Sequence, residues 1–152
     1  MTLRRKKVKM VLEIREQTLH EKAGVLVQAH EGRELAQNHA LSTANHLAEA
    51  KEYRNGLAAK SINLTSWIDA EQWLASKSSQ NALAQSNLQS AELFLSSAHE
   101  KVVEARSNVK RMELLDKRLA TTELRQQSRF EQKSNDELAR RKFLTARRGD
   151  TG

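Results

Sequence analysis

The stretch from Ala84 to Met112 constrains the fold most, because apolar residues recur in it at alternating steps of four and three. Nine successive positions follow this pattern: Ala84, Leu88, Ala91, Leu95, Ala98, Val102, Ala105, Val109 and Met112. The residues between them are mostly Ser, Gln, Asn, Glu, Lys and Arg. A period of about 3.5 residues predicts a helix that packs along a long partner helix in a coiled coil. Since Ala alternates with larger residues, small side chains should face large ones across this seam.

Composition favours helix and argues against a thick core. Hydrophobic residues make up 38% of the chain, below the roughly 45–50% of globular domains. Proline is absent, so nothing forces a helix to break. Cysteine is also absent, which excludes disulfides, thiolate metal sites and a cysteine nucleophile.

No apolar run approaches the ~20 residues that a membrane-spanning helix needs. The stretch Val8 to Ile14 is too short and too charged for the core of a signal peptide. We therefore expect a cytoplasmic protein.

The formal net charge is +7, and its placement is uneven. Residues 61–99 contain one Lys and three acids, whereas residues 100–152 contain 14 basic and 9 acidic groups. The densest basic clusters are Arg4, Arg5, Lys6, Lys7 and Lys9 near one end and Arg140, Arg141, Lys142, Arg147 and Arg148 near the other. Such clusters either stay solvated or bind acidic partners.

The chain should form a single coiled-coil domain over residues 1–152. We expect one helix over about residues 3–59, a bend over about 60–65, a second helix over about 66–147 and a disordered tail over 148–152. Asn55-Gly56 could supply a left-handed cap, or the first helix could run on through Ala59. Thr65 or Ser66 should cap the second helix.

Two long helices with a short connection predict an antiparallel all-α hairpin. Facing residues should have numbers that sum to about 124, which sets Leu26 against Ala98 and Ala50 against Leu74. In this register the C-terminal helix overhangs from about residue 122, for roughly 40 Å at 1.5 Å per residue. The proposed seam comprises Leu12, Leu19, Leu26, Ala36, Leu47, Leu74, Leu88, Leu95, Ala98, Val102, Ala105, Val109 and Met112.

The sequence offers no catalytic or metal-binding pattern. His39 and His46 are two helical turns apart, about 10.5 Å along the axis, too far to share one zinc ion. The serines of residues 76–97 lack a matched His and Asp, and no glycine-rich phosphate loop is present. We expect a protein that is not an enzyme and that binds no cofactor, metal or small-molecule substrate.

Three aromatic residues, Tyr53, Trp67 and Trp73, cluster around the expected bend. Trp67 should close the seam against Leu57, while Tyr53 and Trp73 lie one position off it. They either cap the core of the hairpin or form an exposed contact patch, since Trp and Tyr are favoured in interface hot spots.

The ordered residues around the bend and in the tail resemble those of the FliJ family of flagellar type III export proteins. The bend carries Glu52-Tyr53-Arg54-Asn55, then Trp67-Ile68-Asp69 and Gln72-Trp73, and the tail carries Gln132 to Arg141. The resemblance spans nearly the whole chain. It is shared in part with the YscO-like stalks of injectisomes.

This resemblance implies a stalk that belongs to the flagellar export apparatus. The terminal end of such a coiled coil enters the hexameric export ATPase, and the bend contacts the cytoplasmic part of the export gate membrane protein. Export chaperones are further partners, and the expected location is the cytoplasmic face of the inner membrane at the flagellar base. The family's gate-contacting surface matches here at Tyr53 and, as an aromatic residue, Trp73, and we add Arg54 to this contact. From their charge, we expect Arg4, Arg5, Lys6, Lys7, Lys9, Arg140, Arg141 and Lys142 to bind the ATPase. The chain departs from the family at Glu49, where a second aromatic residue can stand.

Two other interpretations stay open at this point. Charge and length also suit a nucleic-acid-binding coiled coil, although no aromatic stacking platform accompanies the basic ends. A generic scaffold or homodimeric coiled coil is the other alternative. The stalk protein by itself should be a monomer or weak dimer.

Overall fold

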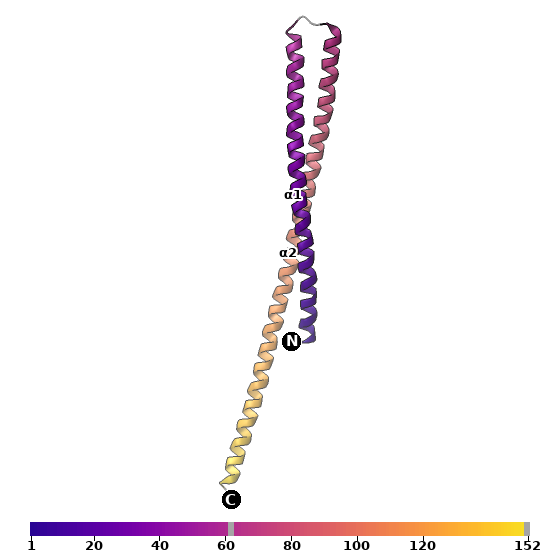
Figure 1. Cartoon of the computed structure of the whole chain (residues 1–152). Coiled ribbons are helices and arrows are strands. Elements are labelled where there is room, and N and C mark those ends of the chain that lie inside the picture. Colours follow the sequence, from indigo (N-terminus) through magenta and orange to yellow (C-terminus); the bar gives the residue numbers. More distant parts are fainter. Residues whose placement is uncertain (61–62, 151–152) are drawn as a thin grey trace. The chain divides into compact units, whose positions relative to one another are not determined.

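The computed structural model describes residues 1–60 and 63–150, and within them it contains two α-helices and no strand. Helix α1 spans Leu3–Ala58 and helix α2 spans Leu64–Gly149 (Figure 1). The prediction of an all-α fold of two long, packed helices is confirmed. Parts of the expected bend and tail, residues 61–62 and 151–152, lie outside the described residues.

Polar side chains define the starts of both helices. The hydroxyl of Thr2 accepts the backbone N–H of Arg5 at 3.2 Å, which caps α1. The side-chain oxygen of Asn63 accepts the N–H of Ser66 at 2.8 Å. Asn63 is therefore the cap of α2, and the prediction of Thr65 or Ser66 is wrong. Because the cap comes earlier in the chain, α2 begins at Leu64 rather than near residue 66.

Helix α1 runs through Asn55-Gly56 without a break and ends at Ala58. No glycine in the described residues has a positive φ, so a left-handed cap at Gly56 does not form there. Instead the last turn tightens: the N–H of Lys60 donates to the carbonyl of Leu57 at 3.1 Å, a bond between residues three apart. Of the two sequence-based alternatives, the continuing helix is correct.

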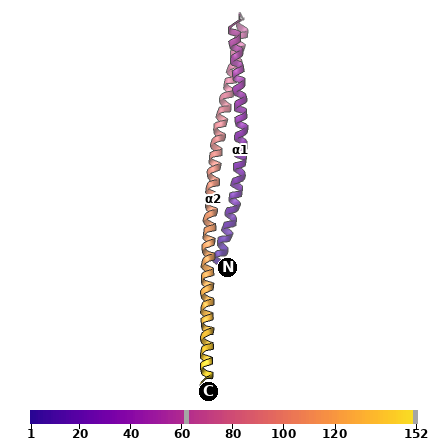
Figure 2. The same cartoon turned by 90° about the vertical axis from the view of Figure 1, so that its left-hand side faces the viewer.

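The chain divides into two compact units, each built from a segment of both helices. One unit, here the closed unit, comprises Leu19–Glu104 and contains the connection between the helices. The other, here the terminal unit, comprises Met1–Thr18 and Ala105–Gly152. Both views of the ribbon show α1 and α2 side by side within these units (Figures 1 and 2).

Contacts within the closed unit identify an antiparallel register. They pair Thr43 with Asn81, Arg33 with Glu92, Arg54 with Glu71 and Tyr53 with Trp73. The residue numbers of these four pairs sum to values between 124 and 126. Neither a shift by a heptad nor a parallel pairing would give such sums, so the predicted register agrees with these contacts.

Small residues occupy the most buried positions of the seam. Ala50 is fully buried, and Ala29, Ala40, Ala70, Ala84 and Ala98 are each at most 3% exposed. Leu26, Leu74, Leu88 and Leu95 are half-buried, because a two-helix core covers large side chains from one side. Layers that combine a buried Ala with a partly covered Leu bring the backbones close together, as the alternation in the sequence requires.

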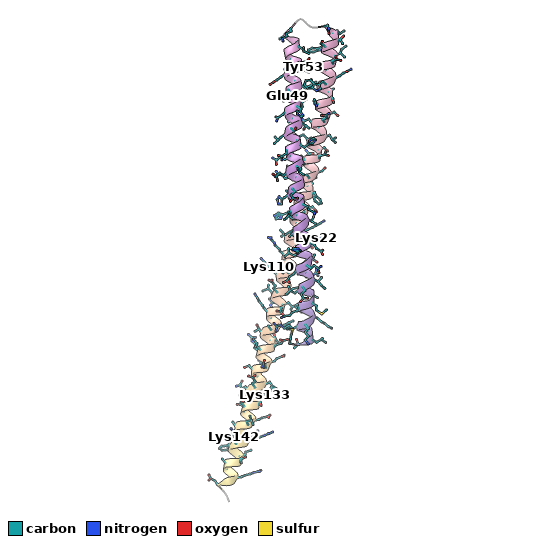
Figure 3. The ribbon with its side chains drawn as sticks, in the orientation of Figure 1. Lys22, Glu49, Tyr53, Lys110, Lys133 and Lys142 are labelled. Carbon is teal, nitrogen blue, oxygen red and sulfur yellow. The ribbon has the colours of Figure 1, made fainter. Side chains whose placement is uncertain are left out.

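In the terminal unit, α2 continues far beyond the start of α1 (Figure 1). Its residues pack against α1 as far as Glu123, and residues 124–150 are all exposed. We call residues 124–149 the single-helix segment. Figure 3 labels Lys133 and Lys142 on this segment, whose side chains point outward around the helix.

Candidate partner-binding surfaces

A hydrogen-bonded cluster holds the start of α1 against α2 in the terminal unit. The carboxylate of Glu123 accepts the backbone N–H of Thr2 at 2.8 Å and the Thr2 hydroxyl at 2.6 Å. The guanidinium of Arg5 donates to Asp116 at 2.9 Å and to Glu123 at 3.2 Å. We call these four residues the N-terminal clasp. In this way Glu123 accepts a backbone N–H at the N-terminus of α1, where negative charge also complements the helix dipole.

The clasp favours the ionised form of both carboxyl groups. Hydrogen bonds from the side chain and backbone of Thr2 lower the pKa of Glu123 to about 2. The hydrogen bond from Arg5 lowers the pKa of Asp116, and Lys9 adds an electrostatic contribution in the same direction. The same pairing raises the pKa of Arg5. Charge complementarity therefore joins the two helices at this end.

The eight basic residues expected to bind an ATPase lie in two different environments. Arg4, Lys6 and Lys7 are exposed near the start of α1, and Arg140, Arg141 and Lys142 are exposed on the single-helix segment. Lys9 is half-buried, and Arg5 points inward to the clasp. Six of the eight side chains are thus freely accessible to a partner, whereas Arg5 already neutralises two acids of its own chain.

The acids of α2 opposite the N-terminal basic run were not among the residues expected to join the helices. The missed signal is a continuation of the seam: steps of seven from Val109 lead to Asp116 and then Glu123. Carboxylates at seam positions opposite a basic segment predict cross-helix ion pairs.

Two aromatic rings contact each other across the helices of the closed unit. The rings of Tyr53 and Trp73 meet edge to face with centroids 5.6 Å apart, a favourable geometry for aromatic pairs. Tyr53 is 53% exposed and Trp73 is 39% exposed, so the pair presents open ring surface to solvent. Trp67 is half-buried at a seam position. The arrangement combines both sequence-based alternatives, because the rings pack together and remain accessible.

Arg54, the third residue expected at the gate contact, is half-buried and pairs with Glu71 at 3.6 Å. Glu49, one turn before Tyr53, is exposed (Figure 3). This end of the closed unit therefore presents two rings, an ion pair and an exposed acid.

The proposed seam residues are all buried or half-buried in the structure. Ala98 and Val102 are 3% exposed, and Ala105 and Val109 are 7% exposed. The half-buried members are Leu12, Leu19, Leu26, Ala36, Leu47, Leu74, Leu88, Leu95 and Met112. A polar layer lies within the seam of the closed unit, where the Thr43 hydroxyl lies 3.0 Å from the Ala40 carbonyl and 3.3 Å from the side-chain oxygen of Asn81.

The described residues contain no group of three or more His, Cys, Asp or Glu that could hold a metal ion. No helix in this part of the chain is long and apolar enough to cross a bilayer. An open surface groove on α2 is lined by Leu114, Lys117, Arg118, Thr121, Thr122 and Arg125.

Two packed antiparallel helices with a heptad seam define the chain as an all-α protein of the coiled-coil type. The sequence pattern of one family, described as "Flagellar FliJ protein", matches residues 5–148. The chain therefore belongs to the FliJ family, whose members are non-catalytic components of the flagellar type III export apparatus. Comparisons with curated proteins and with solved structures gave no match.

Proposed function

We propose that this protein is a stalk that binds and stimulates the hexameric flagellar export ATPase. In this role it also links the ATPase to the cytoplasmic part of the export gate membrane protein and to export chaperones. The proposal rests on family membership and on one observation: the single-helix segment is entirely exposed and rich in basic residues.

The charges of the terminal unit support its role in binding the ATPase. An isolated amphipathic helix gains little stability by itself, so contact with a partner would stabilise the exposed helical segment of 26 residues (124–149). Exposed Arg140, Arg141 and Lys142 would meet acidic groups on that partner, together with Arg4, Lys6 and Lys7. Such pairing would relieve repulsion among the protein's own cations.

The surface around Tyr53 and Trp73 in the closed unit is the candidate contact with the export gate. Trp and Tyr anchor many protein interfaces because they bury a large area and keep one polar atom. The exposed rings of Tyr53 and Trp73 fit this role. Arg54, which pairs with Glu71, can form polar contacts at the rim of the same interface. We also infer a cytoplasmic location at the inner membrane of the flagellar base, and a chain that acts as one domain, monomeric or weakly dimeric.

The test is the rate of ATP hydrolysis by the flagellar export ATPase of the same organism at increasing concentrations of this protein. The wild type should give saturable stimulation. Reversal of Arg4, Lys6, Lys7, Arg140, Arg141 and Lys142 to Glu should abolish it, while Arg5 is kept so that the clasp stays intact. Binding to the purified cytoplasmic part of the gate protein should persist.

The matched variant alters the proposed gate contact instead of the basic residues. Replacement of Tyr53 and Trp73 by Ala should weaken gate binding and leave ATPase stimulation unchanged. Equal loss of both activities in either variant would refute the division between two ends. No stimulation by the wild type, together with retention on nucleic acid that weakens steeply with salt, would favour the nucleic-acid-binding alternative.

A further inference from the structure

A line of five cations follows one side of α2 in the terminal unit. Arg111, Arg118, Arg125, Arg129 and Lys133 are separated by 7, 7, 4 and 4 residues, and all five side chains are exposed. We call this set the basic stripe. None of the five residues belongs to the terminal clusters considered so far, and Arg111 and Arg118 lie where α2 still packs against α1.

The period of the basic stripe differs from that of the seam. The five residues span 22 positions, or about six turns of a straight helix at 3.6 residues per turn, and therefore about 33 Å. A seam between supercoiled helices repeats every ~3.5 residues. At about 100° per residue the five cations fall within an arc of roughly 80°. Over its whole length the stripe averages about 3.7 residues per turn and so runs nearly straight along α2, while its first three members keep the seven-residue step of the seam.

The acids of the same segment lie on the opposite side of the helix. Glu113, Asp116, Glu123 and Glu131 centre about 160° away from the stripe. Two of them bind Arg5 of α1. The acidic side of α2 therefore faces α1, and the basic stripe points away from it.

The stripe cations have no partner within the described residues, where none of the five makes an ion pair. A helix that needed these charges only for solubility could intersperse them with acids, as many exposed helices do. Here the segregation leaves a one-sided positive surface, which self-repulsion disfavours unless a partner compensates it.

The middle of the stripe lies in an open groove lined by Leu114, Lys117, Arg118, Thr121, Thr122 and Arg125. Thr121 and Thr122 donate their hydroxyl protons to the carbonyls of Lys117 and Arg118, both at 2.9 Å. The donors left for a ligand are thus the three cations. Leu114, 55% exposed, supplies an apolar contact beside them.

We propose that the basic stripe binds an acidic α-helix of a protein partner. Carboxylates every fourth or seventh residue of a helix have the same spacing as the stripe, so they can form a ladder of ion pairs along it. Four of the five cations are Arg, which binds carboxylates through two parallel hydrogen bonds. No aromatic residue lies within the stripe to stack on bases, and Leu114 favours a protein over a nucleic acid. Arg125, Arg129 and Lys133 belong to the single-helix segment, so this inference rests on the proposed function at that segment and extends the binding surface along α2 to Arg111.

The test measures binding of the full chain to a designed alanine-rich helical peptide. The peptide carries Glu at positions 1, 8, 15, 19 and 23, and a scrambled peptide of the same composition serves as reference. One variant reverses Arg111, Arg118 and Arg125 to Glu. The matched control reverses Lys51, Arg106 and Lys110, which are exposed, lie off the stripe and give the same change in net charge.

At low salt the wild type should bind the ordered peptide at least about tenfold more tightly than the stripe variant does, with the control within about threefold of the wild type. Circular dichroism should give the same helix content for all three proteins, since every altered side chain is exposed. Equal loss in both variants, equal binding of the scrambled peptide, absence of binding by the wild type, or tighter binding to duplex DNA than to the ordered peptide would each overturn the proposal.

Discussion

Replacement of Ala50 by Leu tests whether small seam residues set the distance between the helices. Ala50 is fully buried, and the register sets it against Leu74, beside the Arg54–Glu71 and Tyr53–Trp73 contacts. Three added carbon atoms have no free space there, so the helices must separate or Leu74 must leave its rotamer. Overpacking of this kind typically lowers the free energy of unfolding by about 1–3 kcal/mol.

The expected change in melting temperature follows from chain length. For a chain of 152 residues, 1 kcal/mol corresponds to about 2–4 °C, so Ala50→Leu should lower the midpoint by about 2–12 °C. Thermal unfolding followed by circular dichroism measures it. Ala48→Leu is the matched control, because Ala48 is exposed on the same helix and the substitution changes helix propensity by the same small amount.

A double variant tests the facing residue. Leu74→Ala alone should destabilise by about 2 kcal/mol, near the low end for Leu to Ala because Leu74 is half-buried. Ala50→Leu together with Leu74→Ala exchanges large for small across one layer, so the two effects should partly cancel, with a coupling of about 1 kcal/mol or more. Additive effects, or an Ala50→Leu protein as stable as the Ala48→Leu control, would refute the layer of large against small residues.

Further predictions concern the clasp, the cap of α2 and a glycine. Because the folded pKa of Glu123 lies near 2 rather than at 4.5, its contribution to stability is present above pH 4.5 and is lost as the pH falls toward 2. Urea midpoints measured from pH 6 to pH 2.5 should therefore fall on acidification, and Glu123→Gln should flatten this slope. Asn63→Ala should lower the free energy of unfolding by about 1 kcal/mol, because the Ser66 N–H loses its acceptor, whereas Asn63→Asp should stay close to the wild type in the same denaturation assay. An added Cβ at Gly32 would meet nothing within 4 Å, so Gly32→Ala should raise the free energy of unfolding by about 0.5–1 kcal/mol. A lower melting temperature for Gly32→Ala would contradict that explanation.

The fold was predictable from the sequence because one physical signal repeats along most of the chain. Apolar residues at steps of four and three over Ala84–Met112 specify a helix with a seam, and the alternation of Ala with larger residues specifies the facing residues. Ala29 and Ala98 are buried, in agreement with this alternation.

The polar contacts were less predictable, because a polar residue at a seam position indicates a break in the apolar pattern and not a contact between helices. Arg5, Asp116 and Glu123 follow the heptad steps, yet their pairing depends on side-chain length and on where α1 begins. The cap of α2 was missed because Asn63, Thr65 and Ser66 are all good cap residues within one turn. Hydrogen bonding to Asn63 decides among them.

The contacts between the helices form a graded series in sequence separation, which has a kinetic consequence. Arg54 and Glu71 are close in the chain, Thr43 and Asn81 are 38 residues apart, and Thr2 and Glu123 are 121 residues apart. Closing a loop costs more conformational entropy as it lengthens, but each contact shortens the loop that remains for the next. Contacts between the helices should therefore form in order, beginning near Tyr53 and Trp73 and ending with the N-terminal clasp. The contacts of the N-terminal clasp would then also be the first to break during local unfolding. A partner could bind there without disturbing the contacts around Tyr53 and Trp73.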